Sequence, residues 1–214
     1  MDEGTFKTFV IFKVNEMRRL FFASILSLLL SPAAFAEAQL TNTSSVAAQN
    51  FIQHIDHFAK NESPDNTFLQ RFWIDSRYAK GPDSPVIFRI AGEYNGELLL
   101  KYASDLPAKG LNAHVVILEH RYYGKSQPFD DLSTAHLRFL TLENVLEDLV
   151  NFQKEISKTY NMNGKWIAVG DSYAGMLAAI YRSTHPELVI GALASSAPMI
   201  ASYPLKPVPP YNEM

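Results

Sequence analysis

Hydrophobic and polar positions follow one another along the chain in blocks that predict strands and helices in alternation. Short, nearly continuous apolar runs at 86–92, 113–118, 166–169 and 189–194 are typical of strands covered on both faces. Between them, apolar residues recur with helical spacing over 96–108, from about 141 to 162, and over 176–185. Thr141 is the expected N-cap of the second of these helices.

Two earlier segments, 51–58 and 67–74, contain aromatic and apolar positions separated by a turn-rich patch and are expected to be antiparallel strands at one edge of a sheet. Strands that alternate with helices form βαβ units, which build a mostly parallel sheet with right-handed crossovers. The chain has no internal repeat and no linker inside residues 37–198. The sequence therefore predicts the α/β fold class with one domain.

The first 36 residues have the pattern of an export signal. Met17-Arg18-Arg19 forms a basic start, Leu20 to Leu30 is apolar, and Ala34-Phe35-Ala36 is a small-x-small cleavage pattern. The apolar segment is shorter than the about 20 residues that span a bilayer, so we expect cleavage after Ala36 and no stable membrane anchor, in preference to a buried N-terminal helix. Residues 17–36 are the expected signal peptide, and residues 1–16 a possible upstream over-extension of the reading frame.

Composition narrows the function classes. The 214 residues carry a net charge of −3, which gives no basic surface for nucleic acid. The chain has no cysteine, which excludes disulfides and thiolate metal sites, and its histidines and carboxylates show no metal-ligand spacing such as H-E-x-x-H. We expect no cofactor, no metal and no nucleic-acid partner.

The chemically most informative stretch is the apolar run that ends at Gly170 and is followed by Ser172 and a helical segment. This is the pattern of a nucleophile elbow, a sharp strand-to-helix turn that presents a serine hydroxyl above a parallel sheet. Ser172 is the predicted nucleophile, and the backbone N–H of Tyr173 is one predicted oxyanion-hole donor. A second donor is expected from the loop 92–96. Ala174 stands where the pattern usually has glycine, so close packing here depends on Gly175.

A serine needs a base and an acid that orients the base, and we find neither after Ser172. The only later histidine, His185, is 13 residues further along the same helix, which at 1.5 Å per residue places it roughly 20 Å away. His57 with Asp56 suggests the chymotrypsin-like order of triad residues, in which the base precedes the serine. That order belongs to a β-barrel fold, whereas this sequence predicts βαβ units. We therefore interpret the chain as the N-terminal half of a longer enzyme and as an inactive fragment.

Several separated blocks together resemble one family, the prolyl-specific serine exopeptidases that include prolylcarboxypeptidase, dipeptidyl peptidase II and thymus-specific serine protease. The similarity extends in family order from about residue 51 to 198, and its most specific block is 119–126, Glu-His-Arg-Tyr-Tyr-Gly-Lys-Ser. The other blocks are 54–58, 70–73, 85–88 with the Gly92-Glu93 loop, 127–129, the elbow, and 191–198.

The resemblance implies an α/β-hydrolase fold with a helical cap inserted after the strand ending near Pro198, so that the Pro-rich residues 199–214 lie at the start of the cap. It implies cleavage of peptides after proline, releasing either a C-terminal residue or an N-terminal dipeptide. Ser172 matches the family nucleophile, whereas the family's Asp and His, the cap and the later strands have no counterpart here. Asp171 and the loop 93–96 depart from the family pattern.

Some roles stay open at this stage. For the block 119–126 we favour a structural role, with Arg121 bridging loop carbonyls or pairing with Glu119 and the tyrosine hydroxyls facing water, over substrate contact. Glu93 is a candidate for binding a substrate amine. An esterase or lipase of the same fold and a non-catalytic exported remnant are the alternative functions. The expected location is periplasmic or extracellular, or lysosomal in a eukaryote.

Overall fold

The computed structural model describes residues 46–199 except 61–62, 64 and 103–104. The predicted signal peptide at 17–36, the segment 1–16 and nearly all of the Pro-rich tail lie outside the described residues. Among the residues described, no helix has the length and apolar character needed to cross a membrane.

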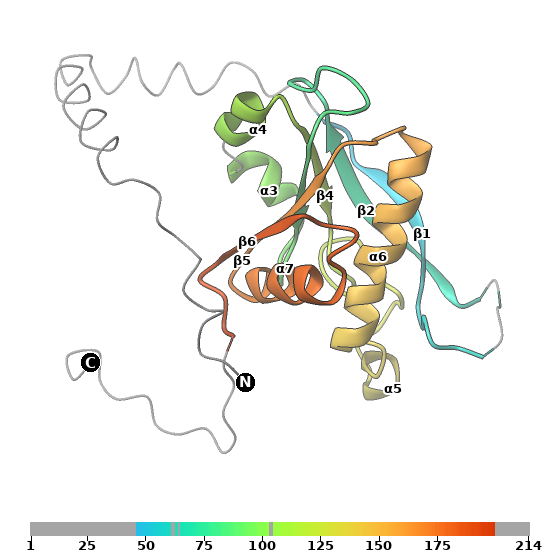
Figure 1. Cartoon of the computed structure of the whole chain (residues 1–214). Helices are drawn as coiled ribbons and strands as arrows, with labels where there is room; N and C mark the ends of the chain where they lie inside the picture. The colour runs from blue at the N-terminus through green and yellow to red at the C-terminus, as the bar shows by residue number, and fades with distance from the viewer. Residues whose placement is uncertain (1–45, 61–62, 64, 103–104, 200–214) are drawn as a thin grey trace, which may run out of the picture. The chain divides into compact units, whose positions relative to one another are not determined.

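A single six-stranded sheet, in the order β1-β2-β4-β3-β5-β6, forms the centre of the described part (Figure 1). Its strands are β1 (Gln49–His54), β2 (Thr67–Asp75), β3 (Val86–Ile90), β4 (His114–Leu118), β5 (Trp166–Asp171) and β6 (Gly191–Ser195). The pairs β3–β4, β3–β5 and β5–β6 are parallel, while β2 is antiparallel to both β1 and β4. The predicted α/β class and the antiparallel strands at one edge are both confirmed.

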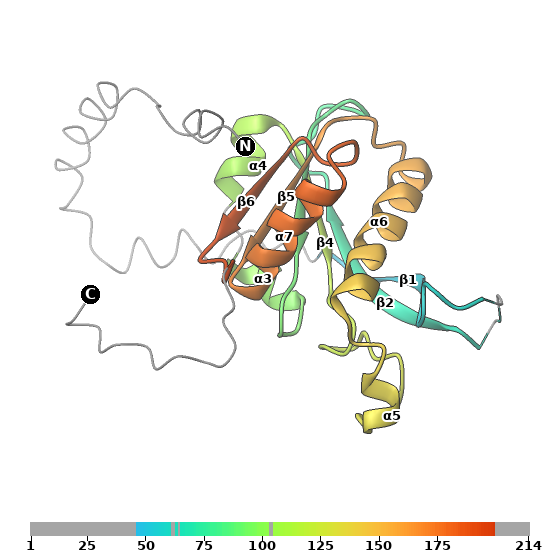
Figure 2. The same cartoon turned by 60° about the horizontal axis from the view of Figure 1, so that its bottom comes forward.

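Helices cover both faces of the sheet (Figures 1 and 2). On one face, α6 (Leu142–Thr159) and α7 (Tyr173–Thr184) pack against alternate residues of the central strands, with Phe88 and Phe152 fully buried. On the other face, α3 (Glu97–Tyr102) and α4 (Asp105–Leu111) pack against the intervening positions, including Ile87 and Ile117. Because successive residues of the central strands face opposite helical layers, β3 and β5 lie between α6 and α7 on one side and α3 and α4 on the other.

The helix boundaries are partly as predicted. Thr141 caps α6, since its side chain accepts a hydrogen bond from the Asn144 backbone N–H. The prediction of a single helix over 96–108 is wrong, because this segment forms two helices, α3 and α4. Pro107 explains the interruption: it has no N–H, and its ring clashes with the carbonyl four residues earlier, so it is tolerated only in the first turn of a new helix. The four-residue helix α5 (Thr134–Leu137) was not expected.

The strand β6 lies at the edge of the described sheet. It begins at Gly191 instead of the expected residue 189, because Val189 is fully buried in the turn that follows α7, where its N–H donates to the His185 carbonyl. Four of its five residues are exposed, among them Leu193 at 61%. An apolar edge strand of this kind is the surface on which a further strand can pair.

Candidate active site

Ser172 occupies the turn between β5 and α7. Its backbone has φ 55° and ψ −126°, a region with positive φ that a non-glycine residue adopts only when the surroundings impose it. The Ser172 N–H donates to the Ser195 carbonyl at 2.8 Å, so the next strand holds this turn. The side chain is exposed and makes no capping hydrogen bond to α7. A constrained backbone with a free hydroxyl is the geometry of a nucleophile elbow.

Two glycines make the close approach of strand and helix possible. A Cβ on Gly170 would lie 2.1 Å from the Ala174 carbonyl oxygen, and a Cβ on Gly175 would lie 2.8 Å from the Ser195 carbonyl oxygen. Ala174 is fully buried, and its methyl lies beside Gly92, where an added Cβ would be only 3.5 Å away. The prediction that packing depends on Gly175, while alanine is accommodated at 174, is confirmed.

The N-terminus of α7 and the loop 92–96 meet at the elbow. Tyr173 is the first residue of α7, where backbone N–H groups have no partner inside the helix and point toward incoming negative charge. A Cβ built on Gly92 would lie 3.8 Å from the Ala174 backbone nitrogen, which places the start of the loop against this helix end. The structure thus brings together the two segments expected to supply oxyanion donors.

The amides of this loop are not all free to act as donors. The Tyr94 N–H donates to the Gly92 carbonyl at 2.8 Å, and the Gly96 N–H donates to Glu119 Oε1 at 2.9 Å. Glu93 follows Gly92 directly and precedes the first of these occupied amides. The amides of Gly92, Glu93 and Asn95 remain, and we take the Glu93 N–H as the candidate for the second donor because it directly follows Gly92, which packs against the start of α7.

The Glu93 side chain is exposed, and its charge acts on two tyrosines, Tyr173 and Tyr94. Burial raises the pKa of Tyr173 to about 12, with further contributions from the negative charge of Glu93 and from Tyr123. Burial also raises the pKa of Tyr94, and the charges of Asp171 and Glu93 add to this effect. The charges of Glu93 and Asp171 therefore act on phenols that burial keeps neutral, while the positive charge of Arg89 opposes them at Tyr94.

His120 lies next to the elbow, and the sequence reasoning gave it no role. Its Nδ1 is 2.6 Å from the Arg121 carbonyl and therefore donates the ring proton there, while Nε2 accepts from the Tyr173 hydroxyl at 3.3 Å. Burial lowers the pKa of His120, which keeps the ring neutral. Both ring nitrogens are used and a carbonyl, not a carboxylate, orients the ring. His120 thus supports the Tyr173 side chain and is not arranged as a base for Ser172.

Asp171, one of the two departures from the resembled family, points to the α3–α4 side of the sheet. Its carboxylate is 3.9 Å from the Arg89 guanidinium, on a side chain that is 56% exposed. Arg89 Nε is buried and has no hydrogen-bond partner among the described residues. The ion pair is therefore formed by the residue directly before Ser172 and a residue of β3.

The block 119–126 has a structural role, as favoured above, with two corrections. Arg121 pairs with Asp148 and not with Glu119: Nε and one terminal nitrogen each lie 2.6 Å from the carboxylate oxygens. The Tyr122 hydroxyl does not face water, because it donates to the His136 carbonyl at 2.5 Å. Arg121 is fully buried and also donates, at 2.8–3.0 Å, to the carbonyls of Ile55, Phe139 and His54.

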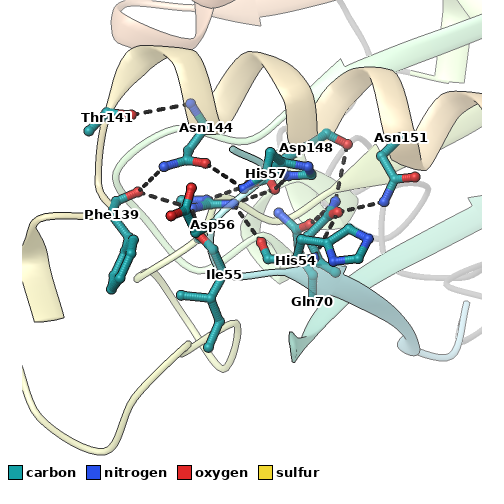
Figure 3. Close-up of polar contacts among 12 residues, drawn as sticks. His54, Ile55, Asp56, His57, Gln70, Phe139, Thr141, Asn144, Asp148 and Asn151 are labelled. Atoms are coloured by element: carbon teal, nitrogen blue, oxygen red, sulfur yellow. Dashed lines mark hydrogen bonds and ion pairs between the residues drawn. The ribbon is translucent and has the colours of Figure 1, made fainter. Parts of the chain in front are cut away.

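His57 is bonded to a carboxylate, as a catalytic base is, but this carboxylate belongs to the buried Arg121–Asp148 pair (Figure 3). Its Nε2 donates to Asp148 Oδ1 at 2.8 Å, and its backbone N–H donates to Asn144 Oδ1 at 3.0 Å. The carboxylate partner is therefore Asp148 on α6 and not the neighbouring Asp56. These contacts join the end of β1 to α6, which agrees with the packing role expected for His57.

The other four histidines lie away from the nucleophile. His114 bonds to Ser76, His136 to Asp131, and His185 caps the end of α7 with its ring 3.5 Å from Glu187. The exposed His54 ring packs edge-on against the His57 ring. Within the described part of the chain, no histidine ring makes a hydrogen bond to the Ser172 hydroxyl. The expectation that His185 is not the base agrees with its place at the far end of α7.

The fold and the elbow define a class, the α/β-hydrolases. The thioesterase domain from the curacin biosynthetic pathway superposes with a TM-score of 0.50 at 18% identity, over 74% of this chain and 48% of that one. A sequence model of the serine carboxypeptidase S28 family matches residues 53–211. The chain belongs to this family of serine-type peptidases, as the resemblance predicted.

Individual relatives agree with this assignment. Thymus-specific serine protease of Mus musculus is 40% identical over 155 residues, covering 70% of this chain and 30% of that protein. Lysosomal Pro-X carboxypeptidase of Homo sapiens is 39% identical over 159 residues, covering 70% of this chain and 31% of that protein. The chain thus spans about a third of the length of these relatives.

The buried carboxylate of Glu119 predicts a specific loss of stability in acid. Burial alone would raise its pKa, but hydrogen bonds from Arg71, Ser126 and the Gly96 amide outweigh burial and hold the pKa below the usual 4.5. Because the folded-state pKa is the lower one, this stabilisation is complete above pH about 4.5 and is lost as the pH falls through the folded-state pKa.

We expect urea midpoints measured from pH 6 to pH 3 to fall steeply below pH about 4.5. The variant Glu119→Gln should be less stable at pH 6 and should lose less stability on acidification than the parent. Equal acid dependence in the two proteins would contradict this role of Glu119.

Proposed function

We propose that this chain supplies the nucleophile of a serine-type exopeptidase that cleaves peptides after proline, as a carboxypeptidase or a dipeptidyl peptidase. The observation that carries the proposal is the exposed Ser172 hydroxyl, held at positive φ where β5 meets the N-terminus of α7. Family membership supports peptide substrates, and the relative named Pro-X carboxypeptidase supports proline as the residue before the scissile bond.

In the proposed reaction the Ser172 oxygen attacks the carbonyl carbon of the proline, and the bond from that carbon to the nitrogen of the next residue is the one that breaks. Negative charge develops on the carbonyl oxygen, and the N–H of Tyr173 and the N–H of Glu93 stabilise it. Donors of this kind are effective because the fold holds them in place before the charge appears. The leaving amine needs a proton, and Ser172 must lose one, so the complete reaction requires a histidine base and an orienting aspartate.

We propose that the acid and the base of this triad are not supplied by the described residues. Among the described residues, the His57 ring is bonded to Asp148 and the His120 ring to Tyr173, and no histidine ring is bonded to Ser172. The chain alone should therefore react with strongly activated reagents and should not turn over peptides. Mutants of triad enzymes that lack the base keep a residual acceleration of about 10³–10⁴ over water, which comes from the oxyanion hole and binding.

We further propose that the exposed Glu93 carboxylate meets the ammonium group of a substrate. Its charge lies near the neutral hydroxyls of Tyr173 and Tyr94. A free N-terminal amine at this position would favour release of a dipeptide. The protein is proposed to be exported after removal of residues 17–36, with residues 37–198 as the hydrolase part and 199–214 leading into a cap.

The substrate class can be tested with covalent probes that do not require turnover. The full chain is treated with a phosphonate that carries a prolyl group and with an alkyl phosphonate of matched reactivity toward hydroxide. We expect the prolyl probe to label Ser172 at least about tenfold faster, since fit in a side-chain pocket is worth about 10–200-fold.

The variant Ser172→Ala serves as the control and should lose labelling by both probes. Faster reaction of the alkyl probe would indicate an esterase instead. Failure of both probes to react above the rate of Ser172→Ala would indicate a non-catalytic remnant.

A further inference from the structure

The loop 92–96 is held from behind by a buried ion pair that lies outside the elbow. The Gly96 N–H donates to Glu119 Oε1 at 2.9 Å, and the neighbouring Asn95 side chain accepts from Arg71 at 2.9 Å. Arg71 also donates to Glu97 Oε1 at 2.8 Å. Three consecutive residues, 95 to 97, are therefore bonded to the Arg71–Glu119 pair.

The pair is itself held without freedom to move. Arg71 donates to both carboxylate oxygens of Glu119, at 2.9 and 2.7 Å, and Glu119 is fully buried. Ser126 Oγ donates to the same carboxylate at 2.7 Å and the Lys125 N–H at 3.1 Å. Gly124, at φ +57°, leaves the required space, because a Cβ there would lie 1.9 Å from Glu119 Oε1. The two parallel hydrogen bonds of a bidentate arginine–carboxylate pair fix the orientation of both side chains relative to each other.

The loop 92–96 connects the Arg71–Glu119 pair to the elbow, because its two ends are anchored at different places. Gly92 packs beside Ala174 at the start of α7, while Gly96, four residues later, is fixed to Glu119 and has its Cα beside Trp73. A Cβ on Gly96 would lie 2.7 Å from the Trp73 ring. The short segment between these anchors includes the Glu93 amide, so movement at Gly96 changes the position of that donor.

We infer that Arg71 and Glu119 are positioning residues for catalysis, fixing the loop that carries the second oxyanion donor opposite the Tyr173 amide. This inference rests on the proposed function, because the loop has an oxyanion role only if Ser172 is the nucleophile. Pre-organised donors lose most of their effect when they are displaced from the position of the developing charge. The Glu-His-Arg-Tyr-Tyr-Gly-Lys-Ser block thus acts on the reaction through its glutamate, without touching substrate.

A second buried pair provides a matched control. Asp148, like Glu119, is a buried carboxylate with a bidentate arginine partner, Arg121, but its contacts lead to β1 and α6 and not to the loop 92–96. A purely structural role of Glu119 predicts the same behaviour for Glu119→Gln and Asp148→Asn. A positioning role predicts that only Glu119→Gln affects the loop and the serine.

The experiment uses the full chain and its Glu119→Gln, Arg71→Lys and Asp148→Asn variants. Hydrogen–deuterium exchange is followed in peptides covering residues 92–98, and the rate of Ser172 labelling by an alkyl fluorophosphonate is measured on the same samples. For Glu119→Gln we expect faster exchange in 92–98 and labelling slowed by about tenfold to a hundredfold. For Asp148→Asn, under conditions where it is folded, both should match the parent.

If Glu119→Gln does not fold, Arg71→Lys decides, because lysine keeps the charge but cannot contact Glu119, Asn95 and Glu97 at once. Normal exchange and normal labelling in whichever of these variants is folded would overturn the inference. Equal effects of Asp148→Asn would also overturn it. If the parent itself is not labelled at Ser172, the proposed nucleophile is wrong, and the exchange of 92–98 alone then shows whether the pair holds the loop.

Discussion

Replacing Arg121 by methionine is expected to lower the free energy of unfolding by about 3–5 kcal/mol. The guanidinium is fully buried and neutralises Asp148, which is itself buried. Removing it leaves a carboxylate in the interior with His57 as its one remaining side-chain partner among the described residues, and it deprives three backbone carbonyls of a donor. Since a domain has a stability of about 5–15 kcal/mol, the loss would be a large part of the total.

Urea unfolding measures this effect, with Arg77→Met as the matched control. Arg77 also forms an arginine–carboxylate pair, with Asp75, but the Arg77 side chain is 34% exposed, and a pair with a solvated member contributes only about 1 kcal/mol or less. The double variant Arg121→Met with Asp148→Leu should recover most of the loss, because the unpaired buried charge is then absent. A single variant Arg121→Met that unfolds within 1 kcal/mol of the parent would contradict the account.

Introducing a methyl group at Gly170 is expected to disrupt the elbow and cost about 3 kcal/mol or more. The new Cβ would lie 2.1 Å from the Ala174 carbonyl oxygen and 2.8 Å from the Gly175 nitrogen, both backbone atoms of α7. Backbone atoms in a helix cannot move aside as a flexible side chain does, so β5 and α7 must separate. Labelling of Ser172 by a fluorophosphonate should be lost together with stability.

The control for this variant is Gly191→Ala, in the neighbouring strand β6, where an added Cβ has nothing within 4 Å. Its urea midpoint and its labelling rate should stay close to those of the parent. A Gly170→Ala protein with the parent's stability and labelling would show that the strand–helix approach is less tight than the structure has it.

The elbow could be predicted from the sequence because its determinants are local. A buried strand, a glycine two residues before the serine, and small residues after it all lie within one short segment, and their steric reasons do not depend on distant parts of the chain. The same holds for the Thr141 cap, where side chain and amide are three residues apart.

The partners of the buried charges could not be predicted in the same way. Arg121 and Asp148 are 27 positions apart, and Arg71 and Glu119 are 48 apart, so each pair forms only once β2, β4 and α6 have packed. Sequence proximity suggested Glu119 as the partner of Arg121, and packing overruled it. One signal was available in the sequence. The charged residues of the block 119–126 follow directly after a buried apolar strand, and this position indicates that some of them are buried and paired.

The role of His120 was also missed for a physical reason. Its contact with Tyr173 joins the end of β4 to the start of α7, which follows β5, across the intervening strand β3, since β4 and β5 both pair with β3. The carboxyl ends of parallel strands meet at one edge of a sheet, so residues directly after β4, β3 and β5 were bound to converge. Applying that rule to every strand end would have placed His120 and Glu93 at the same sheet edge as Ser172.

The central claim is that Ser172 is the nucleophile, and the most direct test is to map where an alkyl fluorophosphonate attaches to the full chain. Peptide mass spectrometry of the labelled protein identifies the residue, with Ser196→Ala as a control at an exposed serine near the elbow. The account predicts slow attachment confined to Ser172, at a rate well below that of a complete Ser-His-Asp enzyme, unchanged in Ser196→Ala and absent in Ser172→Ala. Label distributed over several serines, or persisting in Ser172→Ala, would contradict it.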